Sequence, residues 1–189
     1  MRVSETFVAF DVETANARYG SICAFGIAIV QDGVLVETVQ RVVKPPQSLN
    51  YFEGRNIGIH GISASTVKNA PSLRNAWTEV MEHLDGQTVV THNAAFDINA
   101  LRQAADAIGR RTPRVSYLCT MKVARNTLGL PSNRLPLVAA ELGVPMRHHH
   151  DAGCDAEAAA RIALALMARQ RVRTLTELAR KSGVPWGRL

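Results

Sequence analysis

The sequence has few cysteines and no long apolar run. These features argue against a disulfide-rich protein and against a membrane-spanning one. Its three cysteines are odd in number and scattered along 189 residues. They predict reduced intracellular thiols and argue against a disulfide framework or a cysteine zinc cluster. No run approaches the roughly 18 apolar residues of a membrane span, and residues 1–5 lack the apolar segment of a signal peptide. We therefore expect a cytoplasmic protein with no membrane partner.

The length and the even composition predict one globular domain. A chain of 189 residues can bury a full core, and 47% hydrophobic with 20% charged residues is ordinary for a globular protein. The sequence contains no internal repeat, low-complexity tract or linker. We therefore expect a single domain over residues 1–189, ending in a basic helix at about 172–189.

Acidic residues are absent from positions 107–140, which form the first of two basic zones. Its cationic side chains are Arg110, Arg111, Arg114, Lys122, Arg125 and Arg134. The second zone is residues 161–189, whose seven basic residues and one acidic residue account for the whole net charge of +6. Such zones suit a polyanion, although solvated helix faces would give the same pattern.

The order of predicted elements indicates an α/β sandwich. Three strands come first, with a hairpin turn at Asp32-Gly33, and helices then alternate with strands. The order predicts a mixed five-stranded sheet flanked by helices. We expect strands over 7–13, 21–30, 34–43, 88–92 and 115–119, and helices over 73–84, 95–108, 120–128, 134–142, 152–170 and from Thr174 onward, with an irregular connection over 46–70.

Two carboxylates lie on the first predicted strand. Side chains alternate along a strand, so Asp11 and Glu13 point to one face while Val12 and its apolar neighbours point to the other. An exposed strand end would give the same triplet. If the strand is buried, the carboxylates of Asp11 and Glu13 can bind one metal ion between them.

Two further acidic patterns follow predicted strands or loops. His92-Asn93 and Asp97 come between a strand and a helix, where a polar turn and a helix N-terminal acid are alternatives. His150 and Asp155 are five positions apart, about 140° around a helix, so His150 must precede the helix that contains Asp155. A bland polar loop would also explain the histidines at 148–150.

Together these carboxylates predict a metal-dependent site. Buried carboxylates are costly unless a positive charge lies among them. A pair of divalent metal ions supplies that charge, and paired metals are typical of phosphoryl chemistry.

The three patterns in this order resemble the DEDDh 3′→5′ exonucleases, the family typified by the proofreading epsilon subunit of bacterial DNA polymerase III. The resemblance covers about residues 6–168 and is closest to a free-standing bacterial branch. It implies a ribonuclease H-like fold. The residues that match the motifs are Asp11, Glu13, Asp97, His150 and Asp155, with further matches at Ile59-His60-Gly61-Ile62 and Asn133-Arg134-Leu135.

The resemblance also implies a role for each matching residue. Asp11 would bridge two metal ions, with Glu13 and Asp155 on the first and Asp97 on the second. His150 would be the general base, and an ordinary histidine pKa near 6.5 suits that work at neutral pH. Mg²⁺ is the expected ion, and Mn²⁺ can substitute because both accept oxygen ligands.

The implied substrate is a single-stranded or frayed 3′ end of DNA, released as nucleoside 5′-monophosphates. RNA ends or short oligoribonucleotides are the alternative, and a catalytically dead scaffolding subunit is disfavoured because all five motif residues are present. A polymerase is an implied partner, and the oligomeric state stays open. Arg169, Arg171 and Arg173 are expected to hold the strand beyond the site or a partner. Expected nucleotide contacts come from Val12, Thr14, His92, Asn93 and Phe96.

Overall fold

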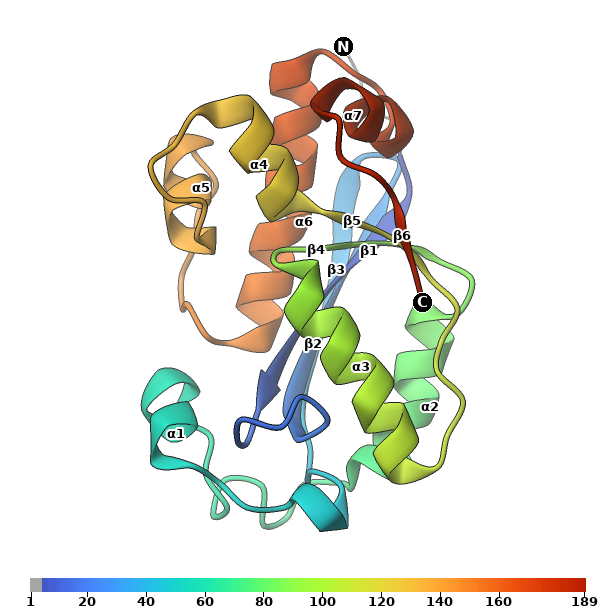
Figure 1. Cartoon of the computed structure of the whole chain (residues 1–189), viewed down its shortest axis with the longest axis vertical. Helices are drawn as coiled ribbons and strands as arrows, with labels where there is room; N and C mark the ends of the chain where they lie inside the picture. The colour runs from blue at the N-terminus through green and yellow to red at the C-terminus, as the bar shows by residue number, and fades with distance from the viewer. Residues whose placement is uncertain (1–4) are drawn as a thin grey trace.

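A computed structural model describes residues 5–189 and contains one mixed six-stranded sheet (Figure 1). The strands lie in the order β3-β2-β1-β4-β5-β6. The first three pair antiparallel, β1, β4 and β5 run parallel, and β6 returns antiparallel to β5. Their bounds are β1 Phe7–Thr14, β2 Ile22–Gln31, β3 Val34–Val42, β4 Thr88–Thr91, β5 Ser116–Cys119 and β6 Gly187–Arg188.

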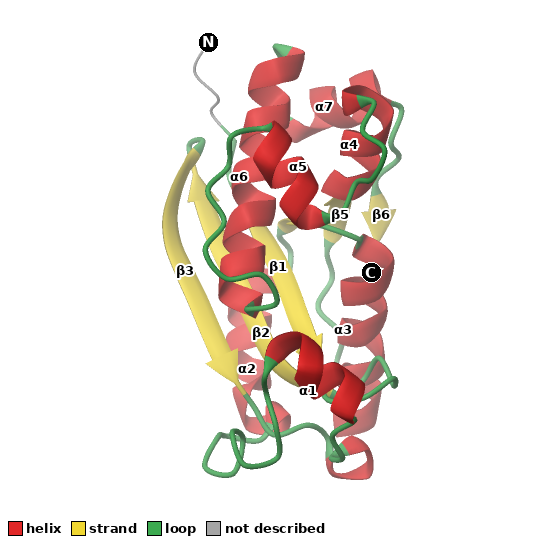
Figure 2. Ribbon diagram, turned by 90° about the vertical axis from the view of Figure 1, so that its left-hand side faces the viewer, coloured by secondary structure: helices red, strands yellow, loops and turns green. Residues whose placement is uncertain are grey.

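Helices cover both faces of this sheet (Figures 1 and 2). Among residues 5–189, no helix has the length and apolar character needed to cross a membrane. One core cluster places α4–α7 against the sheet, and the other places α2 and α3 on the opposite face. The bounds are α1 Gly54–His60, α2 Leu73–Leu84, α3 Ala94–Ile108, α4 Thr120–Leu128, α5 Leu135–Glu141, α6 Ala152–Gln170 and α7 Leu175–Ser182, with a 3₁₀ turn at Gln47–Leu49.

Alternation along β1 decides which side chains face which layer. Phe7 and Ala9 pack in the α6 layer, whereas Val8, Phe10 and Val12 pack in the α2–α3 layer. Asp11 and Glu13 continue the series of Phe7 and Ala9, so their side chains point toward α6. The predicted division of this strand into a carboxylate face and an apolar face is confirmed.

Glycine at position 26 lets α6 approach the sheet. Gly26 on β2 pairs with Asp11, and a Cβ atom there would lie 1.9 Å from the carbonyl oxygen of Ala152. No side chain larger than hydrogen can occupy that space without moving the helix. The first turn of α6 therefore lies directly on the sheet next to β1.

Three features differ from the sequence predictions. The sheet has six strands rather than five, because Gly187–Arg188 pairs with β5. The C-terminal helix spans only Leu175–Ser182 rather than about 172–189, since Gly183 ends it in the left-handed region at φ 68°. The connection over 46–70, expected to be irregular, contains α1.

Candidate active site

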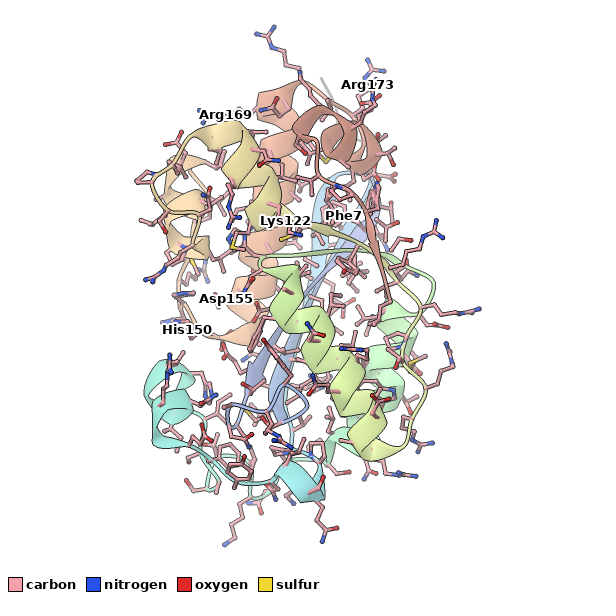
Figure 3. All side chains as sticks on the ribbon, in the orientation of Figure 1. Phe7, Lys122, His150, Asp155, Arg169 and Arg173 are labelled. Carbon is pink, nitrogen blue, oxygen red and sulfur yellow. The ribbon has the colours of Figure 1, made fainter. Side chains whose placement is uncertain are left out.

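Three elements bring the predicted carboxylates to one end of the sheet. Asp11 and Glu13 come from β1, Asp97 from the first turn of α3 and Asp155 from the first turn of α6. Oxygen atoms of Asp11, Glu13 and Asp155 lie within 4.8 Å of one another. Figure 3 shows Asp155 and His150 beside each other where α6 begins. The arrangement can hold a cation between two layers of the fold.

Asp97 is fully buried behind this cluster. Its Oδ1 accepts a hydrogen bond from the backbone N–H of Val12 at 3.3 Å, and its Oδ2 accepts one from the Thr91 hydroxyl at 2.5 Å. Asn93 precedes α3 in the left-handed region at φ 80°, which turns the chain sharply from β4 into the helix. Asp97 is thereby fixed to β1 and β4 at once.

Burial raises the pKa of every one of these four carboxyl groups. The pKa of Glu13 is raised to about 8, that of Asp97 to about 7 and that of Asp155 to about 6, while that of Asp11 is well above its usual range. Neighbouring carboxylates add to the burial effect. Acids whose charged forms are disfavoured by burial and by one another would be stabilised in those forms by a bound cation.

The donor set fits a hard divalent cation. Three carboxylate groups converge within one ion's reach, and Asp97 lies close enough to be electrostatically coupled to them. Oxygen-only donors of this kind suit Mg²⁺ or Mn²⁺. The cluster therefore accommodates the metal that the sequence predicted.

Two histidines lie beside Asp155 rather than one. His149 Nδ1 lies 3.1 Å from Asp155 Oδ2, and the backbone N–H of His150 donates to the same oxygen at 3.1 Å. The two rings stack with centroids 3.7 Å apart. Burial lowers the pKa of both imidazoles, so both are neutral and able to accept a proton at neutral pH. His150 precedes α6, as the sequence predicted.

His92 has a structural role that the sequence prediction did not include. Its Nε2 donates to the backbone carbonyl of Asn133 at 2.9 Å, which leaves Nδ1 to accept from the Thr120 hydroxyl at 2.9 Å. Burial lowers its pKa to about 4, so the ring is neutral. His92 therefore ties the β4–α3 turn to the segment before α5, although its edge still borders the site.

Helix α1 was missed by the sequence analysis and forms one side of the site. Asn56 Nδ2 donates to the Thr14 carbonyl at 2.8 Å, and His60 Nε2 donates to the same oxygen at 3.0 Å. These bonds attach α1 to the last residue of β1. The Ile59-His60 match with the family was the sequence signal for it.

A hollow of about 450 Å³ opens over the carboxylates. Its volume lies within the range of sites that bind small molecules. It brings together every residue that the sequence predicted to be catalytic or to contact a nucleotide, and adds several that it did not. The lining residues are Asp11, Val12, Glu13, Thr14, Asn56, Ile59, His60, His92, Asn93, Phe96, Asp97, Met121, Arg134, Leu135, His149, His150 and Asp155.

The arginines at the end of α6 lie far from this hollow. Figure 3 shows Arg169 and Arg173 at the opposite end of α6 from Asp155. Arg169 lies fourteen positions after Asp155 in this helix, which corresponds to about 21 Å. Arg169 pairs with Glu141 at 2.8 Å. Their predicted contact with a substrate strand stays a prediction, and it requires a long strand.

The geometry agrees with the comparison to known proteins. An exonuclease family model, RNase_T, matches residues 8–163. The chain belongs to this exonuclease family. The resemblance to DEDDh exonucleases drawn from the sequence motifs is thereby confirmed at the level of the family.

Two curated relatives illustrate the range of proteins that carry this domain. One is a candidate bifunctional exonuclease/endonuclease of Mycobacterium tuberculosis, 32% identical over 92% of this chain but only 28% of its own length. Another is the PolC-type DNA polymerase III of Thermotoga petrophila, 27% identical over 92% of the chain and 13% of its own length. The chain thus spans less than a third of either relative.

Solved structures share the fold. Exonuclease X in complex with 5′ overhanging duplex DNA has a TM-score of 0.70 at 21% identity, covering 93% of this chain and 99% of that one. The nuclease domain of 3′hExo, a DEDDh family member bound to rAMP, has a TM-score of 0.73 at 17% identity, covering 89% and 93%. The ribonuclease H-like α/β fold predicted from the sequence is confirmed.

Proposed function

We propose that this domain is a metal-dependent 3′→5′ exonuclease that removes nucleoside 5′-monophosphates from DNA 3′ ends. The observation that carries the proposal is the cluster of four carboxyl groups, three of them buried and all with raised pKa values, beside two neutral histidines in an open hollow. Family membership supports the reaction class.

The chain's own residues divide the work. Asp11, Glu13 and Asp155 would hold the first metal ion, and Asp97 with Asp11 would support the second. When bound, the two ions would supply an activated water and neutralise charge on the reacting phosphate and the leaving 3′ oxygen. His150 takes the proton of the attacking water, since its lowered pKa keeps the imidazole neutral. Val12, Thr14, Asn93 and Phe96 border the terminal nucleotide.

DNA is the favoured substrate because the names of two similar proteins mention it. The relative from Thermotoga petrophila is a DNA polymerase, and the structure of Exonuclease X contains duplex DNA. The same relative makes a polymerase a proposed partner. RNA is the second candidate, since the 3′hExo domain was solved with rAMP. Recognition of the 2′-hydroxyl would separate the two.

The proposal is tested with end-labelled DNA and RNA of matched sequence. Mg²⁺ or Mn²⁺ should allow stepwise release of 5′-mononucleotides from a free 3′ end, and EDTA should abolish it. A circular single strand should survive. Full activity of a metal-stripped sample in EDTA would overturn the metal mechanism, and cleavage of the circle would indicate an endonuclease.

A further inference from the structure

Arg134 is a cationic residue in the lining of the carboxylate hollow. The proposed mechanism gives it no role. It is exposed, it immediately precedes α5 and it lines the same hollow as Asp11 and Asp155. The other basic side chains of its zone are absent from that lining. A polyanionic substrate that enters the hollow therefore meets one guanidinium there.

Helix stability does not explain an arginine at this position. Arg134 occupies the N-cap of α5, makes no side-chain capping bond, and the helix has no acidic residue in its first turn. Serine, threonine, aspartate or asparagine would cap the helix better, and a cation at this end opposes the helix dipole. A role in binding an anion accounts for the residue where folding does not.

The backbone that carries Arg134 is fixed relative to the carboxylates. His92 Nε2 holds the carbonyl of the preceding residue, Asn133, at 2.9 Å. His92 lies in the same β4–α3 turn that leads to Asp97. Because burial keeps this histidine neutral, it joins the two segments as a hydrogen-bonding spacer and adds no charge.

Arg134 nevertheless pairs with none of the carboxylates. Among residues 5–189, five ion pairs form between arginines and carboxylates, and Arg134 belongs to none of them. Its guanidinium is therefore not neutralised by the metal-binding oxygens, although it lines the same hollow. It is free to contact a substrate phosphate that lies beyond the metal-binding cluster.

We propose that Arg134 binds the phosphate one nucleotide upstream of the scissile phosphate. Arginine suits this task because its planar fork can donate two parallel hydrogen bonds to phosphate oxygens. The inference rests on the proposed exonuclease function and adds a subsite to it. This contact would make the enzyme favour substrates that possess the upstream phosphate over those that lack it.

Two dinucleotides isolate this contact. Thymidylyl-thymidine has only the scissile phosphate, whereas its 5′-phosphorylated form also has the upstream one. The wild-type protein should hydrolyse the phosphorylated dinucleotide with a kcat/KM about tenfold higher, the lower range expected for an exposed charge-assisted contact. Arg134→Gln should remove most of this preference, because kcat/KM should fall far more on the phosphorylated dinucleotide than on the unphosphorylated one, and Arg134→Lys should retain part of it.

Arg102→Gln is the matched control. Arg102 is an exposed arginine of α3 that bonds Asn99 and does not line the hollow, so its loss should leave the preference intact. Equal melting temperatures for the variants would exclude unfolding as a cause. An unchanged preference in Arg134→Gln, or an equal loss on both dinucleotides, would overturn the proposal. Failure of the wild-type protein to cleave either dinucleotide with Mg²⁺ or Mn²⁺ would instead refute the proposed function.

Discussion

At the scale of single residues, Asp155 accepts more contacts from the loop before α6 than from any other segment. The ring of His149 and the backbone N–H of His150 both reach its carboxylate. His150 has φ of 67°, in the left-handed region that few residues other than glycine adopt. This conformation turns the chain sharply between the two histidines and α6. His149 thus contacts the Asp155 carboxylate through its ring and His150 through its backbone, although the two rings stack.

The first prediction separates these two histidines. As the general base, His150 should contribute a factor of roughly 10²–10⁴ in rate. His150→Ala should therefore lower kcat by that factor and leave Mg²⁺ binding, measured by calorimetry, nearly unchanged. His149→Ala should lower kcat much less, because its ring supports Asp155 and is not the proposed base. The reverse ranking of the two variants would place the general base at position 149.

Much of the site could be predicted from the sequence because its ligands lie in short local patterns. Asp11 and Glu13 alternate along a buried strand, and Asp155 follows a histidine at a fixed spacing. The supporting contacts could not be predicted, since they depend on the folded backbone rather than on a local pattern. Thr91 donates to Asp97, and His92 spans 41 positions to reach Asn133. Nothing in the local sequence of Thr91 distinguishes it from other strand threonines.

At the scale of elements, α1 is held by polar bonds rather than by packing. None of its residues is buried, which explains why apolar periodicity did not reveal it. Two side chains, Asn56 and His60, attach it to the Thr14 carbonyl. Strand β6 escaped prediction for a related reason: two residues carry no periodic pattern, and only pairing with β5 makes them a strand.

The second prediction tests whether α1 serves the substrate or the fold. Asn56→Ala combined with His60→Ala should release α1 from β1 and raise KM for oligonucleotides several-fold. The melting temperature should change little, because the helix buries no side chain. Hydrogen exchange of residues 54–60 should quicken. Lys68→Ala, an exposed change outside the site, is the control, and an unaltered KM in the double variant would show that α1 does not contact substrate.

The third prediction concerns the basic end of α6. Changing Arg169, Arg171 and Arg173 to glutamine should weaken binding of long single strands and flatten its salt dependence, because fewer counterions are released. Hydrolysis of a dinucleotide should not change, since about 21 Å of helix separates Asp155 from Arg169, the first of the three. An unaltered salt dependence for long DNA would remove them from the substrate path.

At the scale of the whole molecule, the carboxylate cluster couples folding to pH. In the unfolded chain these acids have ordinary pKa values near 4, whereas in the folded protein burial raises them to about 6, 7 and 8 for Asp155, Asp97 and Glu13. Between these limits the folded state binds more protons than the unfolded state. The cluster's contribution to stability is therefore present below about pH 4 and is lost as pH rises through the folded pKa values.

The fourth prediction follows from this linkage. A divalent ion replaces the protons, so added Mg²⁺ should raise the melting temperature more at about pH 8 than at about pH 5.5. Thermal unfolding with Mg²⁺ or EDTA at both pH values measures the difference. Glu13→Gln should reduce the Mg²⁺-induced rise. An equal rise at both pH values would contradict the coupling between protons and metal.

The close packing of α6 on Gly26 has a consequence for synthesis of the chain. Asp11 leaves the ribosome before Asp155 and His150, which follow only after most of the domain has been made. Until α6 reaches the sheet, the proposed site lacks both a metal ligand and its base. On the proposed function, we therefore expect a nascent or prematurely terminated chain that lacks α6 to be inactive on nucleic acids. Degradation would begin only in molecules in which β1 and α6, far apart in the sequence, have met.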